Sequence, residues 1–186
     1  IGQMMEPVEL PEMKEYVVDP EKKPWAATGW KPGDKEPRAV VNSLYITTEE
    51  LTELNERLQA RYAEIEKNEV RYEAYNLDGA ELVITAYGTI ARIWKSAIDE
   101  LKQEGINIGL IRPITLWPFP KDAVREAVMA DGVKGCLTVE LSAGQMVEDV
   151  RLAVNGAKPV EFLGHAGSLL PTAEEIKEKL KSMREE

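Results

Sequence analysis

Polar residues follow the predicted ends of three apolar runs, and these positions are the ones best suited to chemistry. Gly88 and Thr89 come after the first run, Arg112 follows the second, and Glu140 lies at the end of the third. If the runs are parallel strands, their carboxyl ends form one edge of a sheet, which is where open α/β sheets bind ligands. The sequence therefore predicts a candidate site at this edge.

Each of these residues allows a functional and a structural interpretation. A glycine turn at the start of a helix, as at Gly88, can offer free backbone amides to a phosphate group. A tight turn followed by a helix that Thr89 caps with its hydroxyl explains the same residues. Arg112 can contact a ligand or a partner subunit, or it can form an ion pair with Glu140.

Two further segments near this edge could dock against another domain or subunit. Gln145, Glu148 and Asp149 lie at the start of a predicted helix, where acidic groups also complement the helix dipole. Trp117 and Phe119 lie in a proline-rich loop, where they either pack over the sheet or stay exposed as interface anchors. Both segments are candidate interfaces.

The elements that position these residues alternate between strand and helix. The first apolar run is β-branched, as expected for a strand buried on both faces, and helical spacing follows it until Gly105. Near the C-terminus, Thr172 and Glu175 predict a capping box. We therefore expect a three-layer α/β/α domain with a mostly parallel sheet of about five strands. The predicted strands are 70–75, an antiparallel edge strand, and 81–86, 106–111, 135–141 and 160–163, and the helices include 121–129 and 145–154.

The chain divides by composition into three parts. Residues 1–46 contain most of the prolines and little periodicity, which predicts an extended arm from an upstream domain. Residues 47–69 predict a helix, and residues 70–186 predict the α/β domain. Because the arm cannot form its own core, Trp25 and Trp30 are expected to lie on a surface of another domain or subunit.

The overall composition excludes some classes of partner. A chain of 186 residues with 44% hydrophobic residues can bury one good core. Its net charge of -10 argues against binding to nucleic acid or to an anionic membrane. No segment reads as a membrane span, and the lone Cys136, in a predicted strand, is interpreted as an inert core thiol. These features predict a cytoplasmic protein.

The residue types that cofactor sites need are scarce. Iron–sulfur clusters need several cysteines and zinc needs clustered histidine or cysteine, whereas this chain has one cysteine and one histidine, His165, expected in a loop. Thiamine diphosphate bound through magnesium calls for an Asp and Asn array after a glycine turn. Neither Asp78-Gly79 nor Asp131-Gly132 provides that array. We predict no catalytic, cofactor-binding or metal-binding residue in this chain.

The beginning of the chain suggests an upstream partner. It opens on Ile1 rather than methionine, and its first residues read like the end of an earlier element with a proline-rich exit. We expect the C-terminal portion of a longer polypeptide, and a complete but processed protein is the alternative. In the first case the residues that react would lie upstream.

A series of sequence blocks runs in order along the chain and is more specific than any lone glycine motif. The blocks are GQMMEPVELPE, KPWAATG, AYGTIARI, GLIRPITLWPFP, VELSAGQMVEDVRLAVNG and LLPTAEEI. Together they resemble the C-terminal part of one subunit of the 2-oxoacid:ferredoxin oxidoreductases. The resemblance is to the subunit that carries the pyrimidine-binding domain, above all in the 2-ketoisovalerate (3-methyl-2-oxobutanoate) and 2-oxoglutarate enzymes.

This resemblance implies an activity that the chain would share with the rest of a complex. The family oxidatively decarboxylates a 2-oxoacid on thiamine diphosphate, passes electrons through iron–sulfur clusters to ferredoxin, and releases an acyl-CoA. The implied fold is that of a transketolase C-terminal domain, with a role in structure and subunit assembly. Thiamine diphosphate, magnesium and iron–sulfur clusters would be bound elsewhere in the intact complex. The implied partners are the upstream pyrimidine-binding domain, the other subunits and ferredoxin.

Three hypotheses of function follow. The favoured one is a non-catalytic assembly domain of such an oxidoreductase, with 2-ketoisovalerate as the expected 2-oxoacid. The second is a free-standing module that binds a small anionic ligand at the sheet edge near Gly88, Arg112 and Gln145. The third is the corresponding domain of a transketolase or dehydrogenase that does not use ferredoxin, which the blocks around Arg112 and Gln145 fit less well.

Overall fold

The computed structural model describes residues 9–17, 19–23, 25–27, 29–167 and 169–185. These residues divide into two compact units, and the boundary falls between residues 60 and 61. The predicted division into an arm, a helix and an α/β domain is a different partition, and it stays a prediction.

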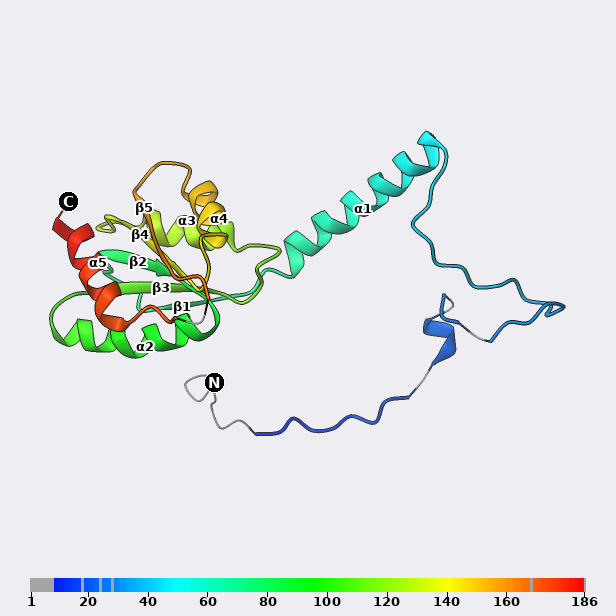
Figure 1. Ribbon diagram of the computed structural model, residues 1–186, viewed down its shortest axis with the longest axis horizontal. Coiled ribbons are helices and arrows are strands. Elements are labelled where there is room, and N and C mark those ends of the chain that lie inside the picture. The colour runs from blue at the N-terminus through cyan, green and yellow to red at the C-terminus, as the bar shows by residue number, and fades with distance from the viewer. Residues whose placement is uncertain (1–8, 18, 24, 28, 168, 186) are drawn as a thin grey trace. The chain divides into compact units, whose positions relative to one another are not determined.

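The C-terminal unit contains a five-stranded mixed sheet (Figure 1). Its strands are β1 (Tyr72–Tyr75), β2 (Leu82–Thr85), β3 (Ile108–Pro113), β4 (Gly135–Glu140) and β5 (Val160–Gly164). They lie in the order β1-β3-β2-β4-β5. β2 is parallel to β3 and β4, β5 is parallel to β4, and β1 is antiparallel to β3. The predicted sheet, mostly parallel with an antiparallel edge strand, is confirmed.

β2 and β1 differ in burial, and their sequences match their central and edge positions in the sheet. All four residues of β2 are buried, because both neighbouring strands are parallel and helices cover both faces. Val83, Ile84 and Thr85 are β-branched and pack well on such a pleated surface. β1 alternates exposed and half-buried residues, as suits a strand at the edge.

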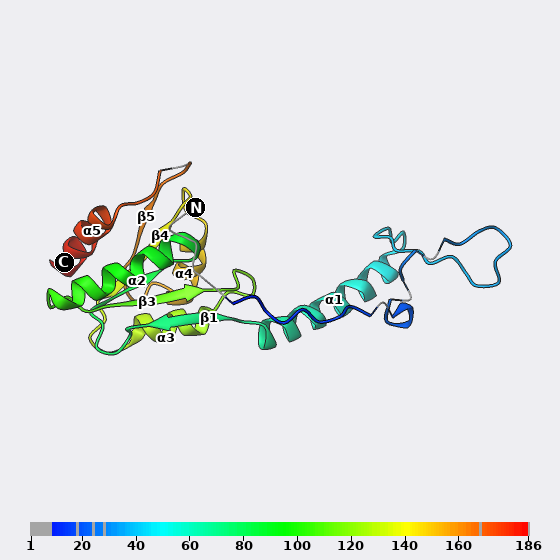
Figure 2. The ribbon, with the colours of Figure 1, turned by 90° about the horizontal axis from the view of Figure 1, so that it is seen from below.

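Helices cover both faces of the sheet (Figures 1 and 2). They are α2 (Gly88–Gln103), α3 (Lys121–Met129), α4 (Met146–Val154) and α5 (Ala173–Glu185). α2 and α5 pack on one face, and α3 and α4 pack on the other. This is the three-layer α/β/α arrangement that the sequence predicted.

Each face of the sheet has its own hydrophobic core. On the α2 side, Trp94 is the largest fully buried side chain, and α5 adds the predicted seam of Ile176, Leu180 and Met183. On the α3 side, Val128 and its neighbours pack under the sheet with α4. Two separate cores on one sheet hold both helical layers in place.

The N-terminal part contains η2 (Pro20–Lys22), a short 3-10 helix, and α1 (Thr48–Asn68). Every residue of α1 is exposed or half-buried. Trp25 is 61% exposed and Trp30 is 39% exposed, and the Trp30 indole Nε1–H donates to the carbonyl oxygen of Glu36 over 2.8 Å. The expectation that another domain or subunit covers these indoles stays a prediction.

The helices differ in length and in polarity. α1 is the longest of the described helices, with 21 residues, and it carries acidic residues in its first turn. None of the helices in the described part of the chain is both long and apolar enough to cross a bilayer.

The burial pattern predicts the outcome of a matched pair of leucine substitutions. Leu101 of α2 is 1% exposed, whereas Leu152 of α4 is 77% exposed. Leu101→Ala is expected to lower the free energy of unfolding by about 2–5 kcal/mol, because it leaves a cavity. Leu152→Ala is expected to change it by less than about 0.5 kcal/mol. Urea denaturation followed by circular dichroism measures both, and equal losses would contradict this assignment of the core.

Candidate functional site

The carboxyl ends of three neighbouring strands lie level at one edge of the sheet. β2, β3 and β4 pair in parallel and in register. Gly88, Arg112, Glu140 and Gln145 lie at or just after these ends. The residues that the sequence singled out therefore share an edge, but their side chains are engaged in separate contacts.

The turn at the start of α2 has no side-chain cap. Tyr87 is the N-cap residue, in an extended conformation, and its side chain makes no capping hydrogen bond. Thr89 lies inside the first turn, so its hydroxyl is not at the N-cap position and the predicted Thr89 cap is wrong. Gly88 has φ +59°, a left-handed conformation that favours glycine in a tight turn.

Arg112 forms an ion pair with Glu73 on β1. Its Nη1 donates to Glu73 Oε2 over 3.1 Å, and the two residues are directly opposed in the antiparallel β1–β3 pair. The predicted ion pair between Arg112 and Glu140 is therefore wrong. The physical reason is the strand order, because β2 lies between β3 and β4 and keeps residues of these strands about 10 Å apart at a spacing of about 4.8 Å.

Glu73 connects three elements through one carboxylate. Besides Arg112 on β3, it accepts a hydrogen bond from Nζ of Lys95 on α2. The hydrogen bond from Lys95, and that from Arg112, lower the pKa of Glu73 below its ordinary value, although partial burial opposes this shift. The edge strand β1 is thus held to β3 by backbone pairing and by an ion pair with Arg112. An ion pair with Lys95 holds it to α2.

The carboxylate of Glu140 is buried and caps α4. Glu140 is 1% exposed. Its oxygens accept hydrogen bonds from the backbone amides of Gln145, Met146 and Val147, at 2.9 to 3.3 Å, and from the hydroxyl of Ser142 at 3.0 Å. A buried carboxylate needs several donors to replace its lost hydration. The amides at the start of α4, which could hold an anionic ligand, are therefore occupied by the chain itself.

The first turn of α4 exposes polar groups on its outer side. Gln145 is the N-cap residue and its side chain makes no capping hydrogen bond. Gln145, Glu148 and Asp149 are exposed. Although Asp149 is exposed, the partial loss of hydration of its carboxyl raises its pKa, and the nearby charges of Glu148 and Glu140 add to this shift. A docking role for Gln145 and Glu148 stays a prediction.

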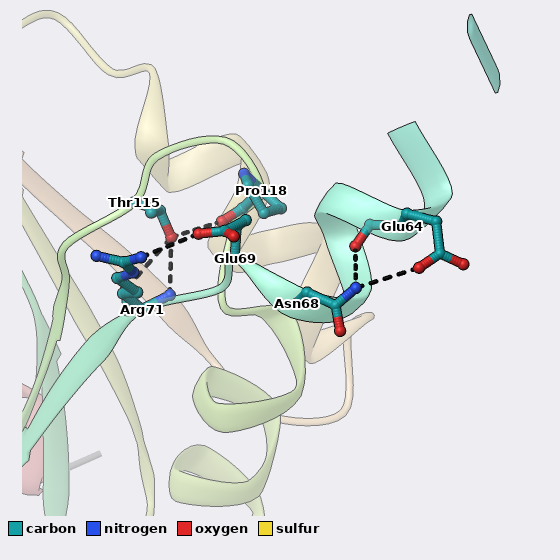
Figure 3. A network of polar contacts seen from close by, with 6 residues as sticks. All are labelled: Glu64, Asn68, Glu69, Arg71, Thr115 and Pro118. Carbon is teal, nitrogen blue, oxygen red and sulfur yellow. Dashed lines mark hydrogen bonds and ion pairs between the residues drawn. The ribbon is translucent and has the colours of Figure 1, made fainter. Parts of the chain in front are cut away.

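The loop between β3 and α3 is fixed to the start of β1 by Thr115 (Figure 3). Thr115 Oγ1 accepts a hydrogen bond from the amide of Arg71 over 3.0 Å and donates one to the carbonyl oxygen of Pro118 over 2.9 Å. The amides of Ile114 and Thr115 donate to the carbonyl oxygen of Arg71. Arg71 also pairs with Glu69 over 3.0 Å. The loop is thus held in one shape by its own chain.

This loop presents Trp117 to the solvent. Trp117 is 55% exposed, and its peptide bond to Pro118 is cis. Its ring and the ring of Tyr62 form a T-shaped contact, with 5.6 Å between the centroids. A groove of about 720 Å³ lies beside it, lined also by Lys67 and Lys121. Trp117 is therefore exposed rather than packed over the sheet, and its use as an interface anchor stays a prediction.

The described residues do not provide the donors that the implied cofactors need. No group of three histidine, cysteine, aspartate or glutamate side chains in the described part of the chain is placed to hold a metal ion. Cys136 is buried beside Thr85, and burial raises the pKa of its thiol to about 11. A protonated, buried thiol is a poor ligand and nucleophile. The described residues therefore do not offer the ligands that an iron–sulfur cluster or a thiamine–magnesium site needs.

Three residues that organise this edge were not found from the sequence. Glu73 carried a weak signal, because it lies at a polar position of an alternating edge strand. Ser142, in the segment after Glu140, resembled an ordinary loop residue. Thr115 acts through backbone groups more than forty positions away in sequence, and no local pattern indicates such a contact.

The buried cap of α4 predicts a difference between two Glu→Gln variants. Glu140→Gln places an amide nitrogen among hydrogen-bond donors, so it is expected to lower the free energy of unfolding by about 1–3 kcal/mol. Glu148→Gln, on the exposed side of the same helix, is expected to change it by less than about 0.5 kcal/mol. Chemical denaturation at neutral pH measures both, and a neutral Glu140→Gln variant would contradict the capping role.

The lowered pKa of Glu73 predicts a dependence of stability on pH. Because its pKa is lower in the folded chain, Glu73 contributes stability above its ordinary value of 4.5, and this contribution is lost as the pH falls through the folded pKa. The stability difference between the wild type and Glu73→Gln should therefore shrink on acidification. Thermal denaturation at several pH values tests this, with the exposed Glu126→Gln as control. A difference that grows in acid would refute it.

Comparisons of sequence place the chain among known proteins. The family model "Pyruvate:ferredoxin oxidoreductase core domain II" matches residues 80–176. The chain is 43% identical to the ketoisovalerate oxidoreductase subunit VorB of Methanothermobacter thermautotrophicus over 98% of its own length and 50% of that subunit. This chain is also 33% identical to the 2-oxoglutarate synthase subunit KorA of Methanothermobacter marburgensis, over 58% of this chain and 28% of that subunit. The chain thus spans about half the length of VorB.

Solved structures share the fold. A chain of the 2-oxoglutarate:ferredoxin oxidoreductase from Magnetococcus marinus superposes with a TM-score of 0.63 at 15% identity, over 82% of this chain and 28% of that one. A split-gene transketolase superposes with a TM-score of 0.51 at 16% identity, over 62% of this chain and 41% of that one. The predicted transketolase-like fold and the resemblance to 2-oxoacid:ferredoxin oxidoreductases are confirmed. The chain belongs to the pyruvate:ferredoxin oxidoreductase core domain II family.

Proposed function

We propose that this chain is a structural and assembly domain of one subunit of a thiamine diphosphate-dependent 2-oxoacid:ferredoxin oxidoreductase. The observation that carries the proposal is the 43% identity to a ketoisovalerate oxidoreductase subunit across 98% of the chain. The substrate of the complex is then 2-ketoisovalerate or a related 2-oxoacid. Cytoplasmic residence belongs to the same proposal.

The chemistry of such a complex takes place outside this chain. A 2-oxoacid and coenzyme A become carbon dioxide and an acyl-CoA, while the electrons pass to ferredoxin. Thiamine diphosphate, magnesium and iron–sulfur clusters are assigned to other parts of the complex, because the described residues offer no cluster of ligands and only a buried thiol. The proposed partners are the upstream pyrimidine-binding domain, the other subunits and ferredoxin.

The contacts at the sheet edge support this role over a free-standing module that binds a small anion. Glu140 occupies the amides at the start of α4 that such an anion would use. The guanidinium of Arg112 is already paired with Glu73. Both charges therefore stabilise the fold of the domain.

The assembly role assigns a task to each part of the chain. Residues 1–46 form an arm that lies against the upstream domain or a partner subunit, residues 47–69 form a helix, and residues 70–186 form the α/β domain. Trp117 is the proposed anchor, because a stiff exposed aromatic loses little freedom on binding and buries a large area.

Reconstitution of the complex tests the proposal. The chain is combined with the remaining part of its subunit and the companion subunits, and ferredoxin reduction that depends on 2-ketoisovalerate and coenzyme A is measured. The chain alone is expected to be inactive and to bind neither thiamine diphosphate nor coenzyme A in calorimetry. Complexes that contain the chain are expected to be active, and complexes that lack it are expected not to assemble.

Two variants separate assembly from folding. Trp117→Ala is expected to weaken assembly by about 2 kcal/mol, roughly 30-fold in the dissociation constant, while the isolated chain keeps its circular dichroism spectrum. Leu152→Ala, which removes an exposed side chain from α4, is the matched control and is expected to assemble normally. The proposal would be refuted by a fully active complex that lacks this chain, or by tight binding of thiamine diphosphate or coenzyme A to the chain alone.

A further inference from the structure

His165 makes a contact that the sequence did not indicate. It directly follows β5, and its backbone amide donates to the carbonyl oxygen of Glu140 over 3.3 Å. Its Nε2 lies 3.4 Å from Oε1 of Glu175 on α5. The end of β5 and the first turn of α5 therefore meet at one imidazole and one carboxylate.

Glu175 is already engaged at the start of α5. Its Oε2 accepts hydrogen bonds from the amide of Thr172 over 2.7 Å and from the hydroxyl of Thr172 over 2.9 Å, and its own amide donates to Thr172 Oγ1 over 3.2 Å. This is the predicted capping box. The hydrogen bonds from Thr172, with a smaller effect of His165, lower the pKa of Glu175. Glu175 thus uses one oxygen for the cap and turns the other toward His165.

The strength of the contact depends on the charge of the imidazole. Nε2 of His165 is shielded from water and has no hydrogen bond of acceptable geometry, although it lies within ion-pair distance of the carboxylate. An uncharged imidazole gains little from such a neighbour, whereas a protonated imidazole is attracted to it. Histidine is the side chain whose charge changes near neutral pH.

We propose that His165 and Glu175 form a pH-sensitive latch that fastens the start of α5 to the end of β5. Protonation of His165 strengthens its contact with Glu175 and closes the latch, and loss of that proton releases it. This inference does not depend on the proposed function.

Several other charged groups of the described chain lie around this junction. Lys179 on α5 pairs with Glu161 on β5 over 3.0 Å. Lys177 on α5 pairs with Glu100 on α2 over 3.2 Å. The carboxylate of Glu140 is directed to the amides of α4. His165 is the only histidine of the chain, so a change in these contacts near neutral pH is assigned to it.

Thermal denaturation of the whole chain tests the latch. The melting temperature of the wild type should exceed that of His165→Gln at about pH 5.5 by about 1–4 °C, and this excess should disappear at about pH 8. Lys179→Gln removes another ion pair between β5 and α5 and is the matched control, because that pair contains no histidine. An effect of His165→Gln that is independent of pH overturns the proposal.

A nuclear magnetic resonance titration tests the same idea without unfolding. The single imidazole gives one set of resonances, and the amide signals of Thr172 and Glu175 should shift with the same midpoint as the imidazole. Glu175→Gln keeps a capping box but removes the charge, so the amide of Thr172 should no longer follow His165. If the amide signals of Thr172 and Glu175 in the wild type do not shift with the imidazole resonances, the proposal is overturned.

Discussion

The burial of the Glu140 carboxylate under the start of α4 is the constraint on which the carboxyl edge of the sheet depends. A charge at 1% exposure is stable only while its donors stay in place, so β4, the Ser142 turn and α4 form one rigid corner. The backbone carbonyl of the same residue accepts the amide of His165 after β5. One residue therefore fixes the end of its own strand, the helix that follows and the neighbouring strand.

The elements of the fold could be predicted because local patterns encode them. Apolar runs and helical spacing located the sheet and its helices, and α3 was predicted at its observed bounds, 121–129. The third predicted strand along the chain began two residues early, because the amide of Ile106 still bonds to Leu101 at the end of α2. Such errors at element ends arise where the hydrogen bonds of a turn, and not the hydrophobic periodicity of the sequence, decide the boundary.

The side-chain pairs at the edge could not be predicted in the same way. Assigning Arg112 to Glu140 required the strand order, and the sequence alone does not reveal that β2 lies between them. The true partner, Glu73, lies in a strand that is antiparallel to β3. Sequence reasoning placed the charged residues at the correct edge, whereas their partners depend on which strands become neighbours in space.

The 21 residues of α1 form a helix without a single buried side chain, and at about 1.5 Å per residue it extends for roughly 30 Å. Apart from the contact of Tyr62 with Trp117, such a helix depends largely on its own backbone hydrogen bonds. The helical content of α1 is therefore expected to respond to temperature and to solvent additives that favour helices, and a partner surface that buries one side of α1 would stabilise it.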